Sequence, residues 1–341
     1  MMTNIYLIIY FLICTILGYF FFKNYSNFAK KINIIDDKNK NYNHKPTPTG
    51  SGLIFVFLFL IGNCIFYVFD LNFLSVLPNR YYLFIVSVII LCVVSFIDDR
   101  TAVDPILRLI LQIFSTYISL ACIDLNSVEL PFKVTLLFSL ILWIYIINIT
   151  NFLDGSDGFL VNIFLFVSIN IFIINHFIDA LLFSPNLFLI LMPVVIIFIY
   201  FNFPPAKLYM GDTGSIFFGF IIGFAALELI SQNYIKLAFA IVAYPLTDCT
   251  ITLVKKLKKG IMPWVGMYDY YFLIPTLKNK VNHKNVLLIS IIFNIFTTIN
   301  IFLLLIYDNF IFLILIYSFC LLQILIYSQL EYRFQKLKFF K

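Results

Sequence analysis

The stretch Asn148-Ile-Thr-Asn-Phe-Leu-Asp-Gly-Ser-Asp-Gly158 lies between two long apolar runs, residues 132–149 and 160–178. Two carboxylates, Asp154 and Asp157, therefore stand at the rim of a hydrophobic slab, where charged groups are energetically costly. Asn, Asp, Gly and Ser are the residues that tight turns use, so a turn explains the glycines and one aspartate. Its four acidic and amide side chains are set three residues apart and share one side of a helical or turn backbone. This spacing indicates a functional role beside the turn.

The composition indicates a multi-pass membrane protein. Of the 341 residues, 62% are hydrophobic and 12% are charged, and the mean hydropathy is +1.00. A soluble core cannot hide that much apolar surface. The net charge of +6 comes from Lys and Arg gathered in loops beside apolar runs, which indicates membrane topology and not nucleic-acid binding. The six cysteines all lie in apolar runs and form no Cys-x-x-Cys pair, so neither a zinc site nor a disulfide framework is indicated.

Several apolar segments approach the length of about 20 residues that a helix needs to cross a bilayer. There are eleven: residues 5–22, 53–69, 81–97, 106–123, 132–149, 160–178, 187–203, 215–230, 237–254, 286–305 and 310–328. They show no period-two alternation, and helices satisfy their own backbone polar groups in lipid, so we expect helices. The predicted fold is an all-α bundle of about 11 transmembrane helices in a single domain, residues 1–341. The first segment has no basic residue before it and no cleavage pattern after it, so it is expected to be a retained span.

The basic residues predict the orientation of this bundle, because cytoplasmic loops are enriched in Lys and Arg. They concentrate in residues 23–45, in the loop 255–285 and in the tail 333–341, which an odd number of spans places on one side. The N-terminus is therefore predicted to be periplasmic and the C-terminus cytoplasmic. The polar segments share the cytoplasmic side, as a membrane-embedded active site requires: residues 45–52, 98–100, 148–158, 204–215 and 255–284.

Adjacent carboxylates, Asp98 and Asp99, close the third apolar segment. They repel each other, so the pair favours a nearby cation, and we interpret it as a general base beside a metal or phosphate. A capping or solvated turn with Arg100 is the structural alternative. Asp104 is a weaker candidate, because Asp-Pro commonly opens a helix. Arg108 is suited to phosphate, although an arginine at a helix end can also simply reach the interface.

Two glycine-containing segments complete the polar set. Lys45-Pro-Thr-Pro-Thr-Gly-Ser-Gly52 combines a base, hydroxyls and glycines before a helix, which is typical of an anion site or of a rigid linker. In Pro204-Pro-Ala-Lys-Leu-Tyr-Met-Gly-Asp-Thr-Gly-Ser215, Asp212 stands between glycines and offers oxygen to Mg²⁺. Tyr209 is placed to stack on a ring. A helix N-cap is the alternative for Asp212.

Carboxylates and cations on one face indicate metal-assisted phosphoryl chemistry. No Ser-His-Asp or Cys-His pairing competes, because His176 is predicted on the far side, and His44 and His283 fall in loops.

The motifs Lys-Pro-Thr-Pro-x-Gly, Phe-x-Asp-Asp-Arg, Asn-x-x-Asn-Phe-x-Asp-Gly-x-Asp-Gly and Pro-Ala-Lys-x-x-Met-Gly-Asp-x-Gly-Ser follow one another between Lys45 and about Gly219. In this order they resemble the polyprenyl-phosphate N-acetylhexosamine-1-phosphate transferases, glycosyltransferase family 4. The resemblance implies a Mg²⁺-dependent enzyme, with Mn²⁺ as an alternative metal. It would transfer a HexNAc 1-phosphate from a UDP-N-acetylhexosamine to undecaprenyl phosphate and release UMP. It also implies a bacterial inner membrane protein, surrounded by membrane lipid, with a cytoplasmic active site that starts a surface polysaccharide such as O-antigen.

The resemblance assigns roles residue by residue. The base for the lipid phosphate would be drawn from Asp98 and Asp99, and Asp212 would be the metal ligand. Substrate-binding residues would be Asn151, Asp154, Asp157, Asn202 and Tyr209 for the nucleotide sugar, with Lys45 and Arg108 near the phosphates. A homodimer is compatible with the family, although no expected span shows a clear Gly-x-x-x-Gly face.

One departure from the family lies in the basic loop. The family carries a His-His-His or a His-x-x-His group there, whereas Pro263–Pro275 contains no histidine. This absence favours the N-acetylglucosaminyl-1-phosphate branch over the peptidoglycan-precursor branch, and it leaves Tyr268, Asp269 or Tyr270 as substitutes. A cation transporter using the acidic cluster and a catalytically impaired relative are the alternative functions.

Overall fold

The computed structural model describes residues 2–36, 46–69, 80–128, 131–178, 182–262, 269–279 and 281–338. Its helices are α1 (Met2–Lys31), α2 (Gly52–Val68), α3 (Tyr81–Arg100), α4 (Pro105–Ser119), α5 (Phe132–Phe152), α6 (Phe159–Phe177), α7 (Ser184–Asn202), α8 (Gly211–Ser231), α9 (Ile235–Ile241), α10 (Ala243–Lys258), α11 (Ile274–Asn279), α12 (His283–Tyr307) and α13 (Phe310–Lys338). Two single 3-10 turns follow α4, at Leu120–Cys122 and Leu125–Ser127. The described strands are one antiparallel pair, β1 (Ile35–Asp36) and β2 (Thr47–Pro48), with Ile35 opposite Pro48.

The prediction of an all-α membrane bundle is confirmed. Each of the eleven expected apolar segments coincides with helix, and nine helices in the described part of the chain are long and apolar enough to cross a membrane. Helix α2 is equally apolar but has 17 residues. The sidedness of the termini and the assignment of one domain remain predictions.

The ninth expected span is not one straight helix. It consists of α9 and α10, which meet at an angle of 70°. Pro245 lies four residues after Ile241, the last residue of α9. A proline has no N–H to donate to the carbonyl four residues earlier, and its ring clashes with that carbonyl, so a continuous helix through this point is disfavoured.

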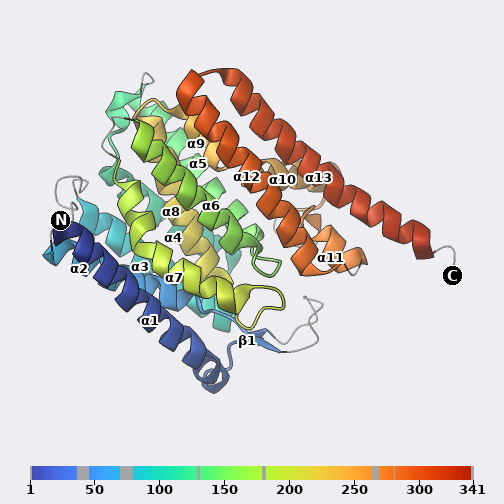
Figure 1. The fold of residues 1–341 in the computed structure, drawn as a ribbon, viewed down its shortest axis with the longest axis horizontal. Helices are drawn as coiled ribbons and strands as arrows, with labels where there is room; N and C mark the ends of the chain where they lie inside the picture. The colour runs from blue at the N-terminus through green and yellow to red at the C-terminus, as the bar shows by residue number, and fades with distance from the viewer. Residues whose placement is uncertain are drawn as a thin grey trace.

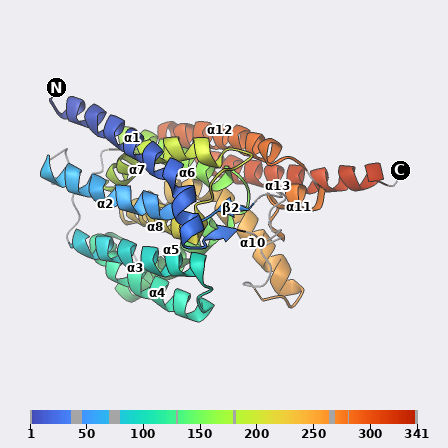
Figure 2. The ribbon, with the colours of Figure 1, turned by 90° about the horizontal axis from the view of Figure 1, so that it is seen from below.

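Helix α8 is the centre of the bundle. Every residue from Thr213 to Ser231 is buried, and α5, α3 and α2 pack against it. Figure 1 shows α1 and the α12–α13 pair at opposite edges with the middle helices between them, and Figure 2 shows α3 and α4 side by side at a third edge. Helices α3, α5 and α2 each contact the start of α8, through Asp99, Asn151 and Gly52.

Two glycines allow α5 to approach α8 closely. A Cβ atom on Gly223 would lie 2.1 Å from Cδ1 of Trp143, and one on Gly219 would lie 2.7 Å from the Cα of Ile147. The Trp143 indole N–H donates to the carbonyl of Phe220 at 2.9 Å. Gly219 and Gly223 form a Gly-x-x-x-Gly pattern in α8 that serves packing within the chain, so it gives no argument for a dimer, and the homodimer stays a prediction.

Glu228 explains the charge buried in α8. Its carboxylate accepts hydrogen bonds from the backbone N–H groups of Phe183 at 2.5 Å and Ser184 at 2.8 Å. These are donors at the start of α7, which have no partner within that helix. Glu228 is thus a helix cap supplied by a neighbouring helix.

Candidate active site

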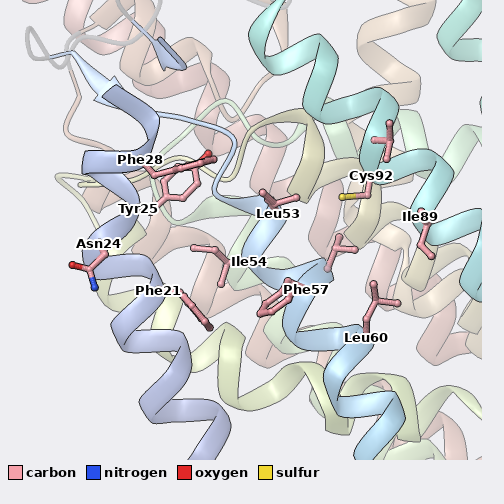
Figure 3. Close-up of a pocket in the computed structure, with 12 residues that line it drawn as sticks. Phe21, Asn24, Tyr25, Phe28, Leu53, Ile54, Phe57, Leu60, Ile89 and Cys92 are labelled. Atoms are coloured by element: carbon pink, nitrogen blue, oxygen red, sulfur yellow. The ribbon is translucent and has the colours of Figure 1, made fainter. Parts of the chain in front are cut away.

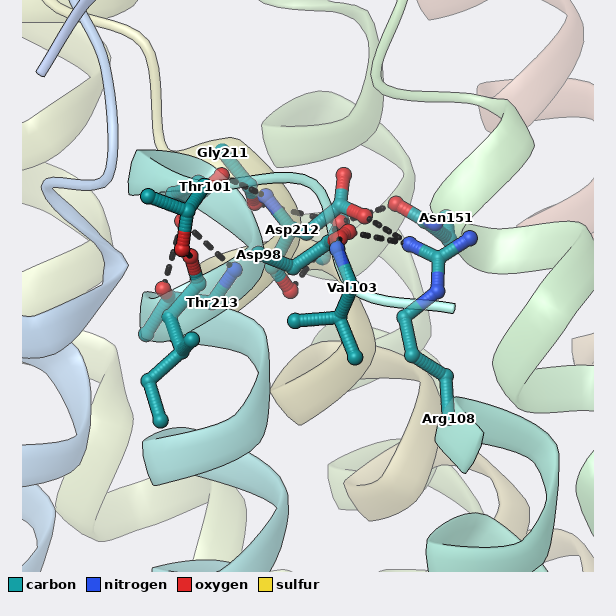
Figure 4. A network of polar contacts seen from close by, with 11 residues as sticks. Asp98, Thr101, Val103, Arg108, Asn151, Gly211, Asp212 and Thr213 are labelled. Carbon is teal, nitrogen blue, oxygen red and sulfur yellow. Dashed lines mark hydrogen bonds and ion pairs between the residues drawn. The ribbon is translucent and has the colours of Figure 1, made fainter. Parts of the chain in front are cut away.

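Arg108 joins two aspartates at the end of the bundle where α3 ends and α8 begins (Figure 4). Its guanidinium donates to Asp98 and, at 2.8 Å, to Oδ2 of Asp212. Asp104 positions this arginine by capping α4, since its carboxylate accepts from the N–H of Ile106 at 2.7 Å. Arg108 therefore faces inward and is not merely an interfacial side chain. Two of the predicted carboxylates meet on one guanidinium.

Asp99 has different partners from its neighbour Asp98. Its two oxygens accept from the N–H of Asp212 at 2.8 Å, and from the N–H and hydroxyl of Thr213 at 3.1 and 2.5 Å. It therefore caps the first turn of α8, whose N–H groups lack partners within the helix. Gly211 makes this approach possible, because it has φ +69° and a Cβ there would lie 2.5 Å from Asp99 Oδ1.

Asn151 reaches the same helix from the end of α5. Its Oδ1 accepts from the Ser215 hydroxyl at 2.6 Å. One turn earlier, Asn148 donates to the side chain of Gln112 in α4 at 2.8 Å. The amides of the 148–158 stretch therefore tie α5 to α8 and α4, and they place Asn151 beside the aspartates (Figure 4).

Asp154 lies in the turn between α5 and α6. Its recessed position raises the pKa of its carboxyl well above the ordinary value, and the negative charges of Asp212, Asp99 and Asp157 raise it further. Four predicted site aspartates thus interact electrostatically at one end of the bundle, and together with Arg108 they form an acidic site that favours cations.

Asp157 and Asn202 are buried and form hydrogen bonds with backbone groups. Asp157 is 2% exposed and accepts from the N–H of Ala206 at 3.0 Å. Asn202 is 3% exposed, accepts from the N–H of Gly158 at 2.9 Å and donates to the carbonyl of Leu208 at 2.9 Å. Both side chains fasten the 148–158 turn to the segment that leads into α8. Their expected contact with a nucleotide sugar stays a prediction.

The segment before α2 is hydrogen-bonded to the same segment, the one that precedes α8. Tyr209 donates its N–H to Pro48 and accepts at its carbonyl from Ser51, and Gly52 donates to Met210 at 2.9 Å. The N–H groups of Ser51 and Gly52 are thus used within the chain. Lys45 lies outside the described residues, and its expected contact with an anion stays a prediction. Tyr209 is half-buried at the edge of the site.

Of the three histidine substitutes expected in the basic loop, one, Tyr270, is buried. Tyr270 is 1% exposed and stacks on Phe152, with ring centroids 5.3 Å apart. Asp269 is exposed, and Tyr268 lies outside the described residues. Tyr270 therefore acts as packing between this loop and the end of α5.

Two residues that were not predicted hold this side of the site. Asp248 is buried in α10 and accepts from the N–H groups of Tyr271 at 3.1 Å and Phe272 at 3.3 Å. The sequence did offer a cue for Asp248, because a carboxylate within an apolar span is energetically costly and indicates a specific role. Asp248 and Glu228 are thus both carboxylates buried in expected spans.

His283 opens α12 beside the 148–158 stretch, after Asn282 caps the helix. Its Nδ1 lies 2.9 Å from the Ser156 hydroxyl and accepts from the N–H of Asp157 at 3.3 Å. Nδ1 is therefore the unprotonated nitrogen. His283 belongs to the site, and its position in the sequence, 126 residues after Asp157, offered no signal.

The donor set fits a hard cation that is shared with a substrate. Among the described residues, no three His, Cys, Asp or Glu side chains converge closely enough to hold a metal by themselves. Mg²⁺ in proteins commonly takes one or two carboxylates and completes its shell with water and substrate phosphates. Asp98, Asp154 and Asp212 offer such carboxylate oxygens at one end of the bundle.

Comparison with known proteins agrees with the motifs. Residues 81–230 match the family model described as Glycosyl transferase family 4. A phospho-N-acetylmuramoyl-pentapeptide-transferase of Petrotoga mobilis is 32% identical over 144 residues, which cover 38% of this chain and 43% of that protein. A probable undecaprenyl-phosphate N-acetylglucosaminyl 1-phosphate transferase of Bacillus subtilis is 24% identical over 186 residues, 50% of this chain and 51% of that protein. A decaprenyl-phosphate N-acetylglucosaminephosphotransferase of Mycolicibacterium smegmatis is 26% identical over 205 residues, 50% of each chain.

The chain spans between 43% and 51% of the lengths of these three relatives. They come from both the peptidoglycan-precursor and the N-acetylglucosaminyl branches, so the preference for the second branch stays a prediction. The resemblance itself is confirmed: residues 81–230, which contain Asp98, Arg108 and Asp212, match the model of glycosyl transferase family 4.

Proposed function

We propose that this protein transfers a HexNAc 1-phosphate from a UDP-sugar to a polyprenyl phosphate such as undecaprenyl phosphate. An oxygen of the lipid phosphate forms a bond to the β-phosphorus of the UDP-sugar. The bond between that phosphorus and the bridging oxygen breaks, and the bridging oxygen leaves with UMP. The product is a lipid diphosphate sugar, which would initiate a surface polysaccharide such as O-antigen at the cytoplasmic face of the bacterial inner membrane.

The observation that carries this proposal is Arg108 held between Asp98 and Asp212 at the end of a membrane bundle. A planar guanidinium binds phosphate oxygens well, and carboxylates beside it can share a divalent cation with a diphosphate. Phosphoryl transfer mainly requires such positioning and charge neutralisation. The names of the relatives support the same reaction class.

Within the pair of adjacent aspartates, we assign the base to Asp98. The oxygens of Asp99 accept three hydrogen bonds from the start of α8, whereas Asp98 accepts from the N–H of Val103 and from the guanidinium of Arg108, the group expected to bind phosphate. Asp212, with Asp154, would hold Mg²⁺, or Mn²⁺ in its place. The ion would neutralise the diphosphate and polarise its oxygens.

The nucleotide sugar would lie against Asn151 and Asp154, which are partly exposed. The buried Asp157 and Asn202 would act by fixing the turn that carries Asp154. Arg108 and Lys45 would bind phosphate oxygens, and Tyr209 would border the nucleotide. Ion transport has no comparable support, because Asp248 and Glu228, two buried carboxylates away from the helix ends that form the site, accept hydrogen bonds from backbone N–H groups.

The test is UMP release by the purified protein from a panel of UDP-sugars with undecaprenyl phosphate and Mg²⁺. We expect release only when lipid phosphate and metal are both present. Asp212→Asn should lower turnover about a hundredfold or more, because a charge that acts on the transition state is lost. Asp308→Asn is the matched control, since Asp308 pairs with Lys236 far from the site and its side chain is 86% exposed. Failure of every UDP-sugar with a folded protein would contradict the proposal.

A further inference from the structure

Two of the pockets in the described part of the bundle differ in charge. One, of about 490 Å³, lies between α1, α2 and α3 (Figure 3), and apart from Asn24 and the Tyr25 hydroxyl its lining side chains are apolar or cysteine. The other, of about 390 Å³, lies where α10 and α11 meet α13, and we call it the α10–α13 pocket. Its lining includes Lys255, Lys256 and Lys259. It therefore offers positive charge, unlike the described lining of the first pocket.

The lysines of the α10–α13 pocket stand against one carboxylate in its described lining, that of Asp269. The ammonium of Lys255 lies 4.4 Å from the centre of the Tyr271 ring, and that of Lys256 lies 5.0 Å from the centre of the Tyr270 ring. A ring face attracts an ammonium without neutralising its charge. Lys256 is 2% exposed, and a buried charge favours an anion close by. The pocket thus holds an excess of positive charge, and two of its ammonium groups are positioned by aromatic rings.

The pocket lies near the level where a membrane-spanning chain meets lipid headgroups. Its lysines belong to the last turn of α10 or directly follow it, and the ninth expected apolar segment ends at residue 254. On the other side of the pocket stands α13, one of the helices long and apolar enough to cross a membrane. Leu321 and Leu325 of this helix, one turn apart, are 46% and 56% exposed, and Leu325 lines the pocket. An anion in the pocket can therefore belong to a molecule whose apolar chain lies in the bilayer.

We propose that the α10–α13 pocket binds the phosphate of an anionic phospholipid such as phosphatidylglycerol, with an acyl chain along the exposed face of α13. Basic pockets between helices at a membrane surface attract such headgroups, because each lysine near the surface adds to the attraction. A soluble phosphate would make the same contacts with the lysines but none with Leu321 and Leu325. The inference goes beyond the proposed transfer reaction, since this lipid is bound and not consumed.

The first measurement counts lipids on the intact protein and needs no turnover. The full-length protein is released from detergent micelles in a mass spectrometer, with equal amounts of phosphatidylglycerol or phosphatidylcholine added. We expect phosphatidylglycerol to be retained and phosphatidylcholine to be lost. Equal retention of the two lipids would overturn the proposal. Displacement of phosphatidylglycerol by an equal concentration of inorganic phosphate, UMP or farnesyl phosphate would also overturn it, because the pocket would then serve a soluble anion or the acceptor.

Variants that remove charge test whether the lipid lies in this pocket. Lys255→Gln with Lys259→Gln should weaken phosphatidylglycerol binding about tenfold or more, because two basic groups near the surface are lost. Lys23→Gln with Lys31→Gln is the matched control, since these exposed lysines lie in α1, outside the pocket, and the change in net charge is the same. Lys255→Arg with Lys259→Arg keeps both charges and should keep the lipid. Equal affinities for the Gln pair and the control pair, or loss of the lipid in a folded Arg pair, would overturn the proposal.

The unfolding temperature in detergent distinguishes loss of the lipid from loss of the fold. A ligand that binds the folded state raises this temperature. Phosphatidylglycerol should therefore raise it more than phosphatidylcholine does in the unmodified protein and in the control pair, but not in the Gln pair. A Gln pair that still gains the same stability from phosphatidylglycerol would contradict binding at this pocket. None of these mixtures contains a UDP-sugar, so their outcome is independent of the proposed transfer reaction.

Discussion

The adjacent aspartates at the end of α3 offer the sharpest test at the scale of single residues. Asp99→Asn replaces one oxygen that accepts N–H groups of α8 with an amide that cannot accept them. Loss of a helix cap costs about 1 kcal/mol. We therefore expect Asp99→Asn to lower the apparent unfolding temperature in detergent more than Asp98→Asn, which loses one acceptor, for the Val103 N–H or for Arg108. UMP release should be lost in Asp98→Asn. Equal unfolding temperatures for the two variants would contradict the capping role.

His283 allows a second test at this scale. His283→Phe removes the acceptor for Asp157 N–H and the partner of the Ser156 hydroxyl, and a buried donor without a partner costs about 1–3 kcal/mol. His283→Asn places an amide oxygen near the position of Nδ1. We expect the Asn variant to keep more stability and more UMP release than the Phe variant. If both variants behave alike, the hydrogen bonds to Nδ1 do not position the turn.

Asp99 and His283 also show what the sequence could and could not predict at the site. The sequence pointed to Asp98, Asp154 and Asp212 because each lies in a polar segment expected on one side of the membrane, and because these segments resemble the motifs of a known family. Capping by Asp99 was one of two open alternatives, since its donors come from residues 113 and 114 positions later. His283 had no local pattern at all, because its partner lies across the fold.

At the scale of helices, the close contact of α5 with α8 predicts a large effect of a small substitution. Gly223→Ala would place a methyl group 2.1 Å from the Trp143 ring, so the ring or the helix must move. Overpacking of this kind costs about 1–3 kcal/mol. We expect a lower unfolding temperature for Gly223→Ala, and partial recovery when it is combined with Trp143→Leu.

Gly18→Ala provides the control for this prediction. Gly18 also lies in a helix, α1, but a Cβ there would meet only ordinary contacts, 3.8 Å from Leu58 and 4.0 Å from Ile197. An unfolding temperature for Gly223→Ala equal to that of Gly18→Ala would contradict the packing argument.

Hydrophobic length predicted all eleven helical segments, because a lipid environment demands helices of that length. It could not predict the bend between α9 and α10, because the sequence stays mostly apolar through this point while Pro245 disfavours a continuous helix. Hydrophobic length also does not reveal which helices pack against each other. The close contact of α8 with α5 depends on Gly219 and Gly223 meeting residues far away in the sequence.

At the scale of the whole molecule, the bundle gathers its acidic residues at one end, and this predicts how metal dependence changes with pH. Burial and the neighbouring aspartates raise the pKa of Asp154 well above its ordinary value, so this carboxyl takes up a proton at a higher pH than a free aspartate does. Protons and Mg²⁺ compete for the same oxygens, so lowering the pH from about 8 to about 6 should raise the Mg²⁺ concentration needed for half-maximal UMP release. Asp154→Asn should show a weaker dependence, because the competing proton site is gone. A half-saturating Mg²⁺ concentration that stays constant over this range in the unmodified protein would show that Asp154 does not share its charge with the metal.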